Sequence, residues 1–306
     1  MSALADLRKD WPALEFADWA PTAQTLHMWT QIVGKVRMAL TPAVNHWWHV
    51  PLYVSPRGLT TTAIPDGART FEIEFNFLDH RLDITCSDGG AQHFALTPMA
   101  VADFHAELMA ALARIGVAPR IWTTPCEVPA PIPFEQDRLH RSYDAEAVSR
   151  FFRVLVQVDR VMKVFRGRFL GKCSPVHFFW GSFDLAVTRF SGRPAPPHPG
   201  SAILPASVSG EAYSHEAMSV GFWPGDAGHE ALFYAYAYPE PAGFPDAATT
   251  RSGRYEPELG EFVLPYAAVR EAHAPDYAIL GFFQRAYEAA ADLAGWPRDA
   301  LERRAP

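Results

Sequence analysis

The sequence predicts an α+β fold of two similar halves, each an antiparallel sheet with helices beside it. Three observations predict this fold. The chain has 306 residues, which suits about two units of 100 to 200 residues. Apolar residues recur every three or four positions in four segments, and they alternate or cluster in the segments between. The order helix, aromatic strand, further strands, helix then occurs twice along the chain.

The four periodic segments are expected to be helices. In each of them the apolar residues form one stripe, so that one face of the helix is buried. Thr97 suits the start of the second helix and Gly116 its end, and Gly295 ends the fourth. The expected helices span residues 22–40, 97–116, 144–169 and 279–293.

Strands are expected between the helices. In 71–77 the odd positions are aromatic or aliphatic and the even positions are polar, the pattern of a strand with one buried face. A two-residue turn at Asp79 and His80 would pair Phe77 with Leu82. The other expected strands span residues 47–54, 59–64, 177–190, 216–223, 231–238 and 260–265.

A proline-rich segment around 125–133 is the expected boundary between an N-terminal half, 1–130, and a C-terminal half, 131–306, that carries the candidate site. His-Trp-Trp at 46–48 follows the first helix much as His-Phe-Phe at 177–179 follows the third. This echo favours an internal duplication. The alternative is a chance likeness, because the two spacings from helix to strand differ.

Composition and charge exclude several classes of protein. With 49% hydrophobic and 20% charged residues the chain has enough apolar surface to fold. A net charge of −7 disfavours nucleic-acid binding, and no apolar run is long enough to span a membrane. Asp6, Arg8 and Lys9 stand where a signal peptide needs an apolar core, so we expect a cytoplasmic protein. Three cysteines without C-x-x-C spacing predict reduced thiols.

The strand expected at 177–190 carries the most suggestive face. Alternation places Trp180, Ser182 and Asp184 on one side of it, where they would form a polar, aromatic-walled surface typical of ligand pockets. We therefore expect Asp184 to be catalytic and Trp180 and Arg189 to bind a ligand. The alternative is that Asp184 forms an ion pair with an arginine and Trp180 belongs to the core.

Further candidates surround a second proline-rich segment, 193–210, which we expect to cover the pocket. His215 and Glu216 follow it, and a histidine beside a carboxylate suits general acid–base catalysis; the alternative is a surface or capping role. Alternate tyrosines then share one strand face, as in a ligand wall or a half-wet sheet surface. The ligand-binding candidates on that face are Tyr234, Tyr236 and Tyr238.

The cofactor is unknown from the sequence, with a divalent metal as one version of the hypothesis. In that version His177, His198 and His215 would be the ligands, together with Asp184 or Glu216, and water would fill an open position.

A basic stretch stands out in this acidic chain. Residues 150–172 carry seven Lys or Arg against one acid, Asp159. Cations near a helix C-terminus complement its dipole, so a solvated helix face is expected. The alternative is a site for an anionic small-molecule ligand. The chain has no nucleic-acid-binding motif, and it lacks the motifs of zincins, α/β-hydrolases, Rossmann folds and P-loop proteins.

Four long segments carry a resemblance to a known family. They span 29–54, 174–193, 213–225 and 233–244, and include the runs HFFWGSFDLAVTRFSGR and YSHEAMSVGFWPG. These runs resemble those of an uncharacterised bacterial domain-of-unknown-function family, and the likeness covers nearly the whole chain. The resemblance implies a bacterial origin and a single full-length architecture. It implies no activity and no catalytic residues.

These patterns predict a cytoplasmic small-molecule enzyme or ligand-binding protein with an aromatic-rich pocket in its C-terminal half. The alternative is a non-catalytic structural or interaction protein whose aromatic strands only pack the two halves together. That alternative predicts no pocket beside Asp184. The sequence does not indicate the reaction, the oligomeric state or whether the protein is an enzyme.

Overall fold

A computed structural model describes residues 10–200, 205–247 and 249–303 of the chain. Within these ranges no helix is both long enough and apolar enough to cross a membrane. Asp6, Arg8 and Lys9, on which the expectation about a signal peptide rested, lie outside the described residues.

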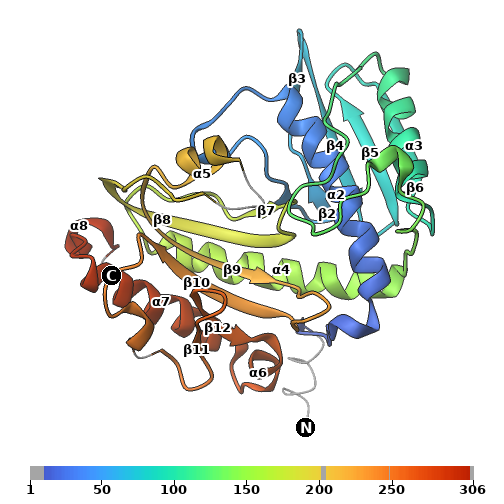
Figure 1. The fold of residues 1–306 in the computed structure, drawn as a ribbon. Helices are drawn as coiled ribbons and strands as arrows, with labels where there is room; N and C mark the ends of the chain where they lie inside the picture. The colour runs from blue at the N-terminus through green and yellow to red at the C-terminus, as the bar shows by residue number, and fades with distance from the viewer. Residues whose placement is uncertain (1–9, 201–204, 248, 304–306) are drawn as a thin grey trace.

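The fold is α+β as predicted, with helices against two antiparallel sheets of six strands each (Figure 1). All four expected helices form, and the carboxylate of Asp144 caps the longest by accepting two backbone N–H groups of its first turn. The helices are α2 (Ala20–Leu40), α3 (Val101–Arg114), α4 (Ala145–Gly167), α5 (Ala206–Ala212), α6 (Tyr266–Glu271), α7 (Pro275–Leu293) and α8 (Arg298–Leu301), with 3-10 helices η1 (Phe16–Asp18), η2 (Asn45–Trp47), η3 (Phe134–Gln136) and η4 (Phe244–Asp246).

The N-terminal sheet confirms the alternation expected in 71–77 but not the register of the hairpin. Phe75, not Phe77, pairs with Leu82. The side chain of Asn76 accepts two backbone N–H groups of the turn and so closes a longer loop. A shift of two residues keeps every side chain on its own face, which is why the pattern could not detect it. The strands are β1 (Tyr53–Val54), β2 (Gly58–Thr60), β3 (Ile64–Asp66), β4 (Arg69–Asn76), β5 (Arg81–Cys86) and β6 (Ala91–Ala95).

Two other strands expected in this half are wrong. Residues 47–54 contain the end of η2 and only the two-residue strand β1, and residues 59–64 divide between β2 and β3. The cause is positive φ at His46, Trp47 and Thr62, which interrupts an extended backbone.

The C-terminal sheet has the strand order β11-β12-β10-β9-β8-β7. The single strand expected at 177–190 is wrong, because the chain turns back on itself at 180–183. Phe183 adopts a φ of +61°, and its N–H donates to Phe179 O, so that Phe179 pairs with Asp184 across a hairpin. The strands are β7 (His177–Phe179), β8 (Asp184–Pro194), β9 (His215–Trp223), β10 (Leu232–Tyr238), β11 (Arg254–Glu256) and β12 (Glu261–Pro265).

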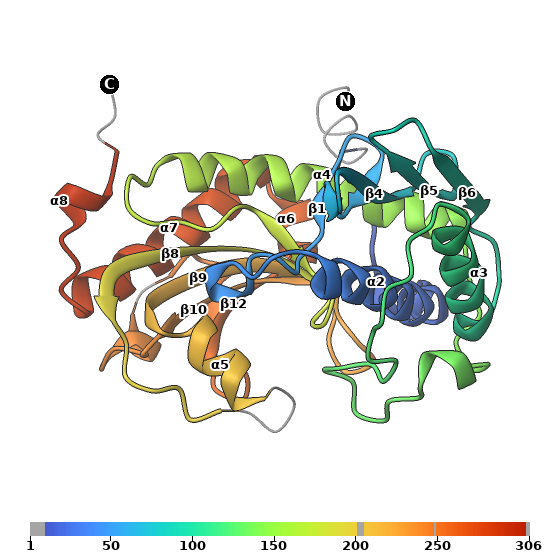
Figure 2. The ribbon, with the colours of Figure 1, turned by 90° about the horizontal axis from the view of Figure 1, so that it is seen from above.

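The two faces of the C-terminal sheet have different surroundings. One face packs into the main hydrophobic core, with Val187, Val220 and Phe233 buried there. Figure 2 shows α4 and α7 on that side of the sheet and α5 on the other. We call the second side the open face. It carries Asp184, Ala186 and Thr188 of β8, Ser219 and Gly221 of β9, Tyr234, Tyr236 and Tyr238 of β10, and Glu261 of β12.

The two halves share one hydrophobic core that runs from Trp11 to Leu301. Leu52 of the first half and Phe178 of the second exchange two backbone hydrogen bonds of 2.9 and 2.7 Å. The domain boundary at 130/131 and the internal duplication stay predictions.

Candidate functional site

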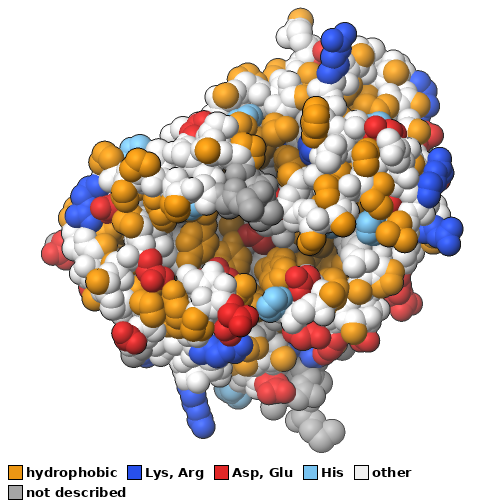
Figure 3. Space-filling view, in the orientation of Figure 1, with side chains coloured by type: hydrophobic (Ala, Val, Ile, Leu, Met, Phe, Trp, Pro, Cys, Tyr) orange, Lys and Arg blue, Asp and Glu red, His pale blue; other side chains and the backbone are white. Residues whose placement is uncertain are grey.

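The open face lies at the bottom of a hollow in the surface. Figure 3 shows this hollow in the centre of the view, lined by side chains of the class that includes tyrosine and by acidic side chains. Tyrosines at alternate positions of β10 supply aromatic surface. Beside them the hydroxyls of Ser219 and Thr188 form a hydrogen bond of 3.0 Å. Concave surfaces with aromatic walls and a few convergent polar groups are where small molecules bind.

Asp184 lies at one end of this face and is almost completely buried, with 6% of its surface exposed. Its two carboxylate oxygens accept hydrogen bonds from the hydroxyls of Ser182 and Tyr234. Tyr234 reaches it from two strands away because its ring lies across Gly221, where an added methyl group would be 2.1 Å from the Tyr234 ring. No cation pairs with Asp184 among the described residues, and burial raises its pKa above the ordinary value.

Two more carboxyl groups lie close enough to Asp184 to respond to its charge. Burial, and then the charge of Asp184, raise the pKa of Glu127 to about 7. The same two causes raise the pKa of Glu261 to about 7. Like charges disfavour one another's ionised form, so these three carboxyl groups share fewer than three negative charges near neutral pH.

Glu127 enters the cluster from a loop of the first half. Its carboxylate lies against Gly181, where an added methyl group would be 2.0 Å from Glu127 Oε1. Its own backbone has a φ of +57°, an uncommon conformation for a residue other than glycine. Such conformations persist where the surroundings hold them, and they cluster at functional sites.

Helix α2 supplies those surroundings through three polar residues spaced four apart. His27 Nε2 donates to Gly181 O at 2.8 Å, and burial lowers the pKa of His27 to about 4, which keeps the ring neutral. The Gln31 amide pairs with both backbone groups of Cys126, at 2.8 and 2.9 Å. Lys35 Nζ donates to the carbonyl oxygens of two loop residues before Cys126. Residues at i, i+4 and i+8 share one helix face, so α2 holds both loops of the site.

The proline-rich segment lies over the far end of the same face. Tyr213, which follows α5, meets the Tyr236 hydroxyl at 3.0 Å. His198 stacks on Tyr213 with ring centroids 4.5 Å apart, and the Tyr238 hydroxyl donates to Pro196 O. The described part of this segment therefore covers Tyr238, and it reaches Tyr236 through Tyr213.

The structure places two of the predicted ligand-binding residues away from the hollow. Trp180 lies in the hairpin turn, where its indole N–H donates to Val50 O at 2.9 Å. Arg189 lies on the opposite face of β8 and is fully buried, with its guanidinium 3.5 Å from the centre of the Phe165 ring. Both are core residues by their surroundings, as the alternative interpretation of Trp180 anticipated.

His215 and Glu216 do not join Asp184 either. The Glu216 carboxylate accepts from Ser191 and Arg193 in a structural ion pair, with Arg193 Nη2 at 2.7 Å. His215 lies beside His46, with ring centroids 5.8 Å apart.

The three histidines proposed as metal ligands are dispersed. His177 is fully buried next to Tyr53, and burial lowers its pKa to about 3. His198 lies in the covering segment and His215 at the start of β9. Within the described part of the chain, no three His, Cys, Asp or Glu side chains are arranged to hold a metal ion.

Five of the seven cations of residues 150–172 lie on α4, behind the sheet, and Arg168 and Lys172 follow the helix. Arg160 pairs with Asp276, and Lys163 pairs with Asp159, which is the solvated helix face expected from the sequence. Two surface pockets of about 250 and 480 Å³ adjoin α4, and neither is lined by a residue of the open face.

Comparison with known proteins assigns the family. The model of DUF5996, a family of unknown function, matches residues 11–303. The chain belongs to the DUF5996 family. The resemblance found in the sequence is confirmed. No curated protein and no solved structure matches the chain.

Sequence reasoning missed four parts of the site in this DUF5996 protein. Glu127, Glu261 and Tyr213 stand alone in loops or at a strand end, where no local pattern marks them. The fourth part, the polar stripe of His27 and Gln31 continued by Lys35, was visible. It lies on the side of the helix away from the apolar stripe and is a local signal for these loops of the site.

We expect Gln31→Ala to displace the Glu127 loop of this DUF5996 protein. The substitution leaves the N–H and C=O of Cys126 without their partners, so it should cost about 2 kcal/mol of stability. It should also bring the pKa of Glu127 down from about 7 toward its ordinary value. Urea unfolding and the ¹³C titration of labelled carboxyl groups measure the two effects. Gln24→Ala, an exposed site on the same helix, is the control, and an unchanged Glu127 titration in Gln31→Ala would contradict this role.

Proposed function

We propose that this protein is an enzyme that carries out general acid–base chemistry on a small molecule bound in the hollow over the open face. The observation that carries the proposal is the trio of Asp184, Glu127 and Glu261. A general acid or base works best when its pKa lies near the working pH, and two of these carboxyl groups have a pKa of about 7. Perturbed carboxyl groups in a concave site are a recognised indicator of catalysis.

The roles follow from the surroundings of each group. Asp184 is buried with two hydroxyl donors, so it acts as the fixed charge that keeps its neighbours partly protonated. Glu127 and Glu261 retain some contact with solvent and are the groups that would exchange protons with a substrate. The hydroxyls of Tyr213 and Tyr236 would hold the substrate by hydrogen bonds.

The chemistry of the hollow also limits the substrate. Three carboxyl groups without a cationic partner in the described structure repel a carboxylate or phosphate. We therefore propose a neutral or cationic substrate that carries hydroxyl, carbonyl or amine groups. An anionic ligand, the alternative interpretation of residues 150–172, would have to bind at those cations, outside this hollow.

Thermal-shift screening of small molecules against wild type and a Glu127→Gln/Glu261→Gln variant tests the proposal. Neutral and cationic compounds should raise the melting temperature of the wild type, and the double variant should lose the shift. Tyr236→Phe should weaken the same hits about tenfold, because one hydrogen bond to a ligand contributes about 1.4 kcal/mol.

Tyr277→Phe is the matched control, since Tyr277 is 78% exposed on α7. Conversion of a hit should depend on pH with an apparent pKa near 7. Hits that bind the double variant as well as the wild type would refute the proposal. So would a panel in which no compound shifts the carboxyl resonances of Glu127 or Glu261, the result that a purely structural or interaction protein predicts.

A further inference from the structure

A second group of reactive side chains lies on the same sheet face as Asp184 but at the other end of β8. Phe190 belongs to it and is six residues from Asp184, which in a strand is about 20 Å. The group consists of Lys172, His46, Trp48, Phe190 and His215, and we call it the Lys172 cluster. Its members come from both halves of the chain, and the distance separates it from the acid site.

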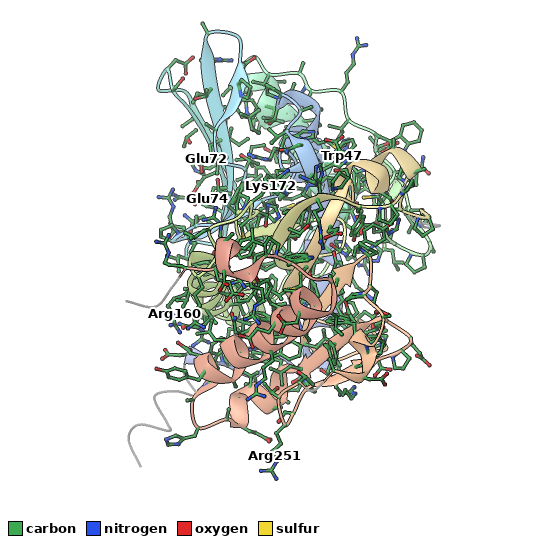
Figure 4. All side chains as sticks on the ribbon, turned by 90° about the vertical axis from the view of Figure 1, so that its left-hand side faces the viewer. Trp47, Glu72, Glu74, Arg160, Lys172 and Arg251 are labelled. Carbon is green, nitrogen blue, oxygen red and sulfur yellow. The ribbon has the colours of Figure 1, made fainter. Side chains whose placement is uncertain are left out.

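Lys172 is held at the surface with an unusual set of neighbours. Its backbone carbonyl accepts the Phe190 N–H at 3.0 Å, which fixes it to the edge of β8. Its Nζ lies 5.5 Å from the centre of the Trp48 ring and 5.2 Å from that of Phe190. No carboxylate of the described structure forms a salt bridge with it. Figure 4 shows Lys172 on the side of the molecule turned toward the viewer, and its side chain is exposed, so small reagents reach it.

The closest polar partner of this amine is a neutral imidazole. His46 Nε2 lies 2.7 Å from Lys172 Nζ. On the other side of the ring, Nδ1 donates to Ala212 O at 3.0 Å, so the Nε2 lone pair faces the lysine. Burial lowers the pKa of His46, and the charges of Lys172 and His215 lower it further. The ring is thus a hydrogen-bond acceptor for the ammonium form and a proton acceptor when that form deprotonates.

The backbone of His46 and the residue after it has an unfavourable conformation. His46 and Trp47 are consecutive residues with φ of 57° and 61°. Each such conformation costs on the order of 1 kcal/mol and persists only where the surroundings hold it. Here the conformation turns the His46 ring inward between Ala212 O and Lys172 Nζ. The guanidinium of Arg193, on the same strand as Phe190, is occupied by Glu216 and by two carbonyl oxygens of the α7 C-terminus.

We propose that Lys172 is a nucleophilic amine that forms an imine with an aldehyde, with His46 carrying the proton. The arrangement offers an amine between two aromatic faces, and Arg193 is already paired with Glu216 rather than free to hold an anion. It therefore suits a neutral carbonyl compound, best an aromatic one that packs on Trp48 and Phe190. The proposal is independent of the acid–base function at Asp184.

The step is balanced without a further reactant. The Lys172 ammonium first gives a proton to His46 Nε2. The amine lone pair then attacks the carbonyl carbon, and a C–N bond forms. A second proton moves from the nitrogen to the former carbonyl oxygen, which becomes a hydroxyl. His46 returns its proton to that hydroxyl, which leaves as water. The product is the protonated imine, and His46 is neutral again.

The test uses the four lysines of the chain as internal references. The protein is incubated with benzaldehyde and sodium cyanoborohydride at pH 7.5, and the benzylated lysines are quantified by peptide mass spectrometry. Lys163 is the matched control, because it is also exposed but is paired with Asp159 at 2.6 Å. Loss of hydration lowers the pKa of Lys172. We expect it to be benzylated faster than Lys163, because a lowered pKa leaves more of the Lys172 amine neutral at pH 7.5.

His46→Asn removes the imidazole base and keeps the local backbone conformation. An asparagine amide can still donate to Ala212 O and tolerates positive φ, but it presents no Nε2 to Lys172. Labelling of Lys172 should fall in this variant, because no base is left beside Nζ to take its proton, while labelling of Lys163 is unchanged. Asp184→Asn should leave the labelling of Lys172 unaltered.

Two results would overturn the proposal. The first is equal labelling of Lys172 and Lys163 in the wild-type protein, a measurement that needs no variant to fold. The second is Lys172 labelling that stays high in folded His46→Asn.

Discussion

Asp184→Asn is expected to lower the pKa of Glu127 and Glu261 and to make the protein less sensitive to alkaline pH. Both glutamates have a pKa of about 7 in the folded protein, against 4.5 ordinarily. The folded state therefore holds more protons than the unfolded state between these values. Below about pH 4.5 both glutamates are protonated in the folded and the unfolded state, and the stability contribution of the raised pKa is present in full. As the pH rises through 7, the folded state gives up these protons too, and that contribution is lost.

The size of the effect follows from the shifts. Each pKa unit corresponds to about 1.4 kcal/mol. After discounting for the partial exposure of both side chains, we expect the wild-type protein to lose about 3 kcal/mol of stability between pH 5 and pH 8. Asp184→Asn removes the part of each glutamate's pKa shift that is due to charge repulsion. It leaves the part due to burial, which is the larger cause for each glutamate.

The variant should fold. An asparagine can still accept from the Tyr234 hydroxyl, and the Ser182 hydroxyl can turn to accept from the new amide. Urea unfolding at four pH values measures the slope, and carboxyl ¹³C shifts follow each glutamate. Glu127→Gln/Glu261→Gln, which should abolish most of the slope, is the control. Titration of the wild-type glutamates near 4.5 would contradict the site, and severe unfolding of Asp184→Asn would assign Asp184 a structural role.

Trp180→Ala is expected to destabilise the protein by about 3–5 kcal/mol, as removal of a buried aromatic side chain usually does. The indole is 6% exposed, and its N–H donates to Val50 O. It also packs on α2 at Gly34, where an added methyl group would lie 2.2 Å from the ring. The substitution opens a cavity at the junction of the two halves and leaves the Val50 carbonyl without its partner.

Two further variants bracket this prediction. Gly34→Ala should also destabilise, because the new methyl group and the indole cannot occupy the same space. Trp122→Ala should change stability by less than about 0.5 kcal/mol, since Trp122 is 74% exposed. Chemical denaturation measures all three. A Trp180→Ala protein as stable as the Trp122→Ala protein would return Trp180 to the list of ligand-binding candidates.

Much of the fold was predictable because it depends on local periodicity. The apolar stripe of 144–169 and the alternation of 71–77 each specify an element and its buried face, and both are confirmed. The pattern failed where the backbone leaves the regular regions. Positive φ at His46, Trp47 and Phe183 interrupts the strands expected at 47–54 and 177–190, and these residue types did not predict it.

The candidate site was predictable only in part. Asp184, Tyr234 and Tyr236 do lie on one face, although Asp184 reached it through a hairpin rather than along one strand. Arg189 was named as a ligand-binding candidate together with Asp184, but it lies on the opposite face of the sheet. Residues 184 and 189 differ by an odd number of positions, so alternation puts them on opposite faces of β8.

The sequence by itself determined an α+β fold, its four long helices and a second half richer in polar and aromatic strand faces. Only the tertiary structure brought Glu127 and Glu261 to Asp184, and His46 to Lys172. The physical reason is that the pKa of a carboxyl group, or the partner of an amine, depends on burial and on charges within a few ångströms. Residues distant in the chain supply these, and α2 holds them in place through His27, Gln31 and Lys35.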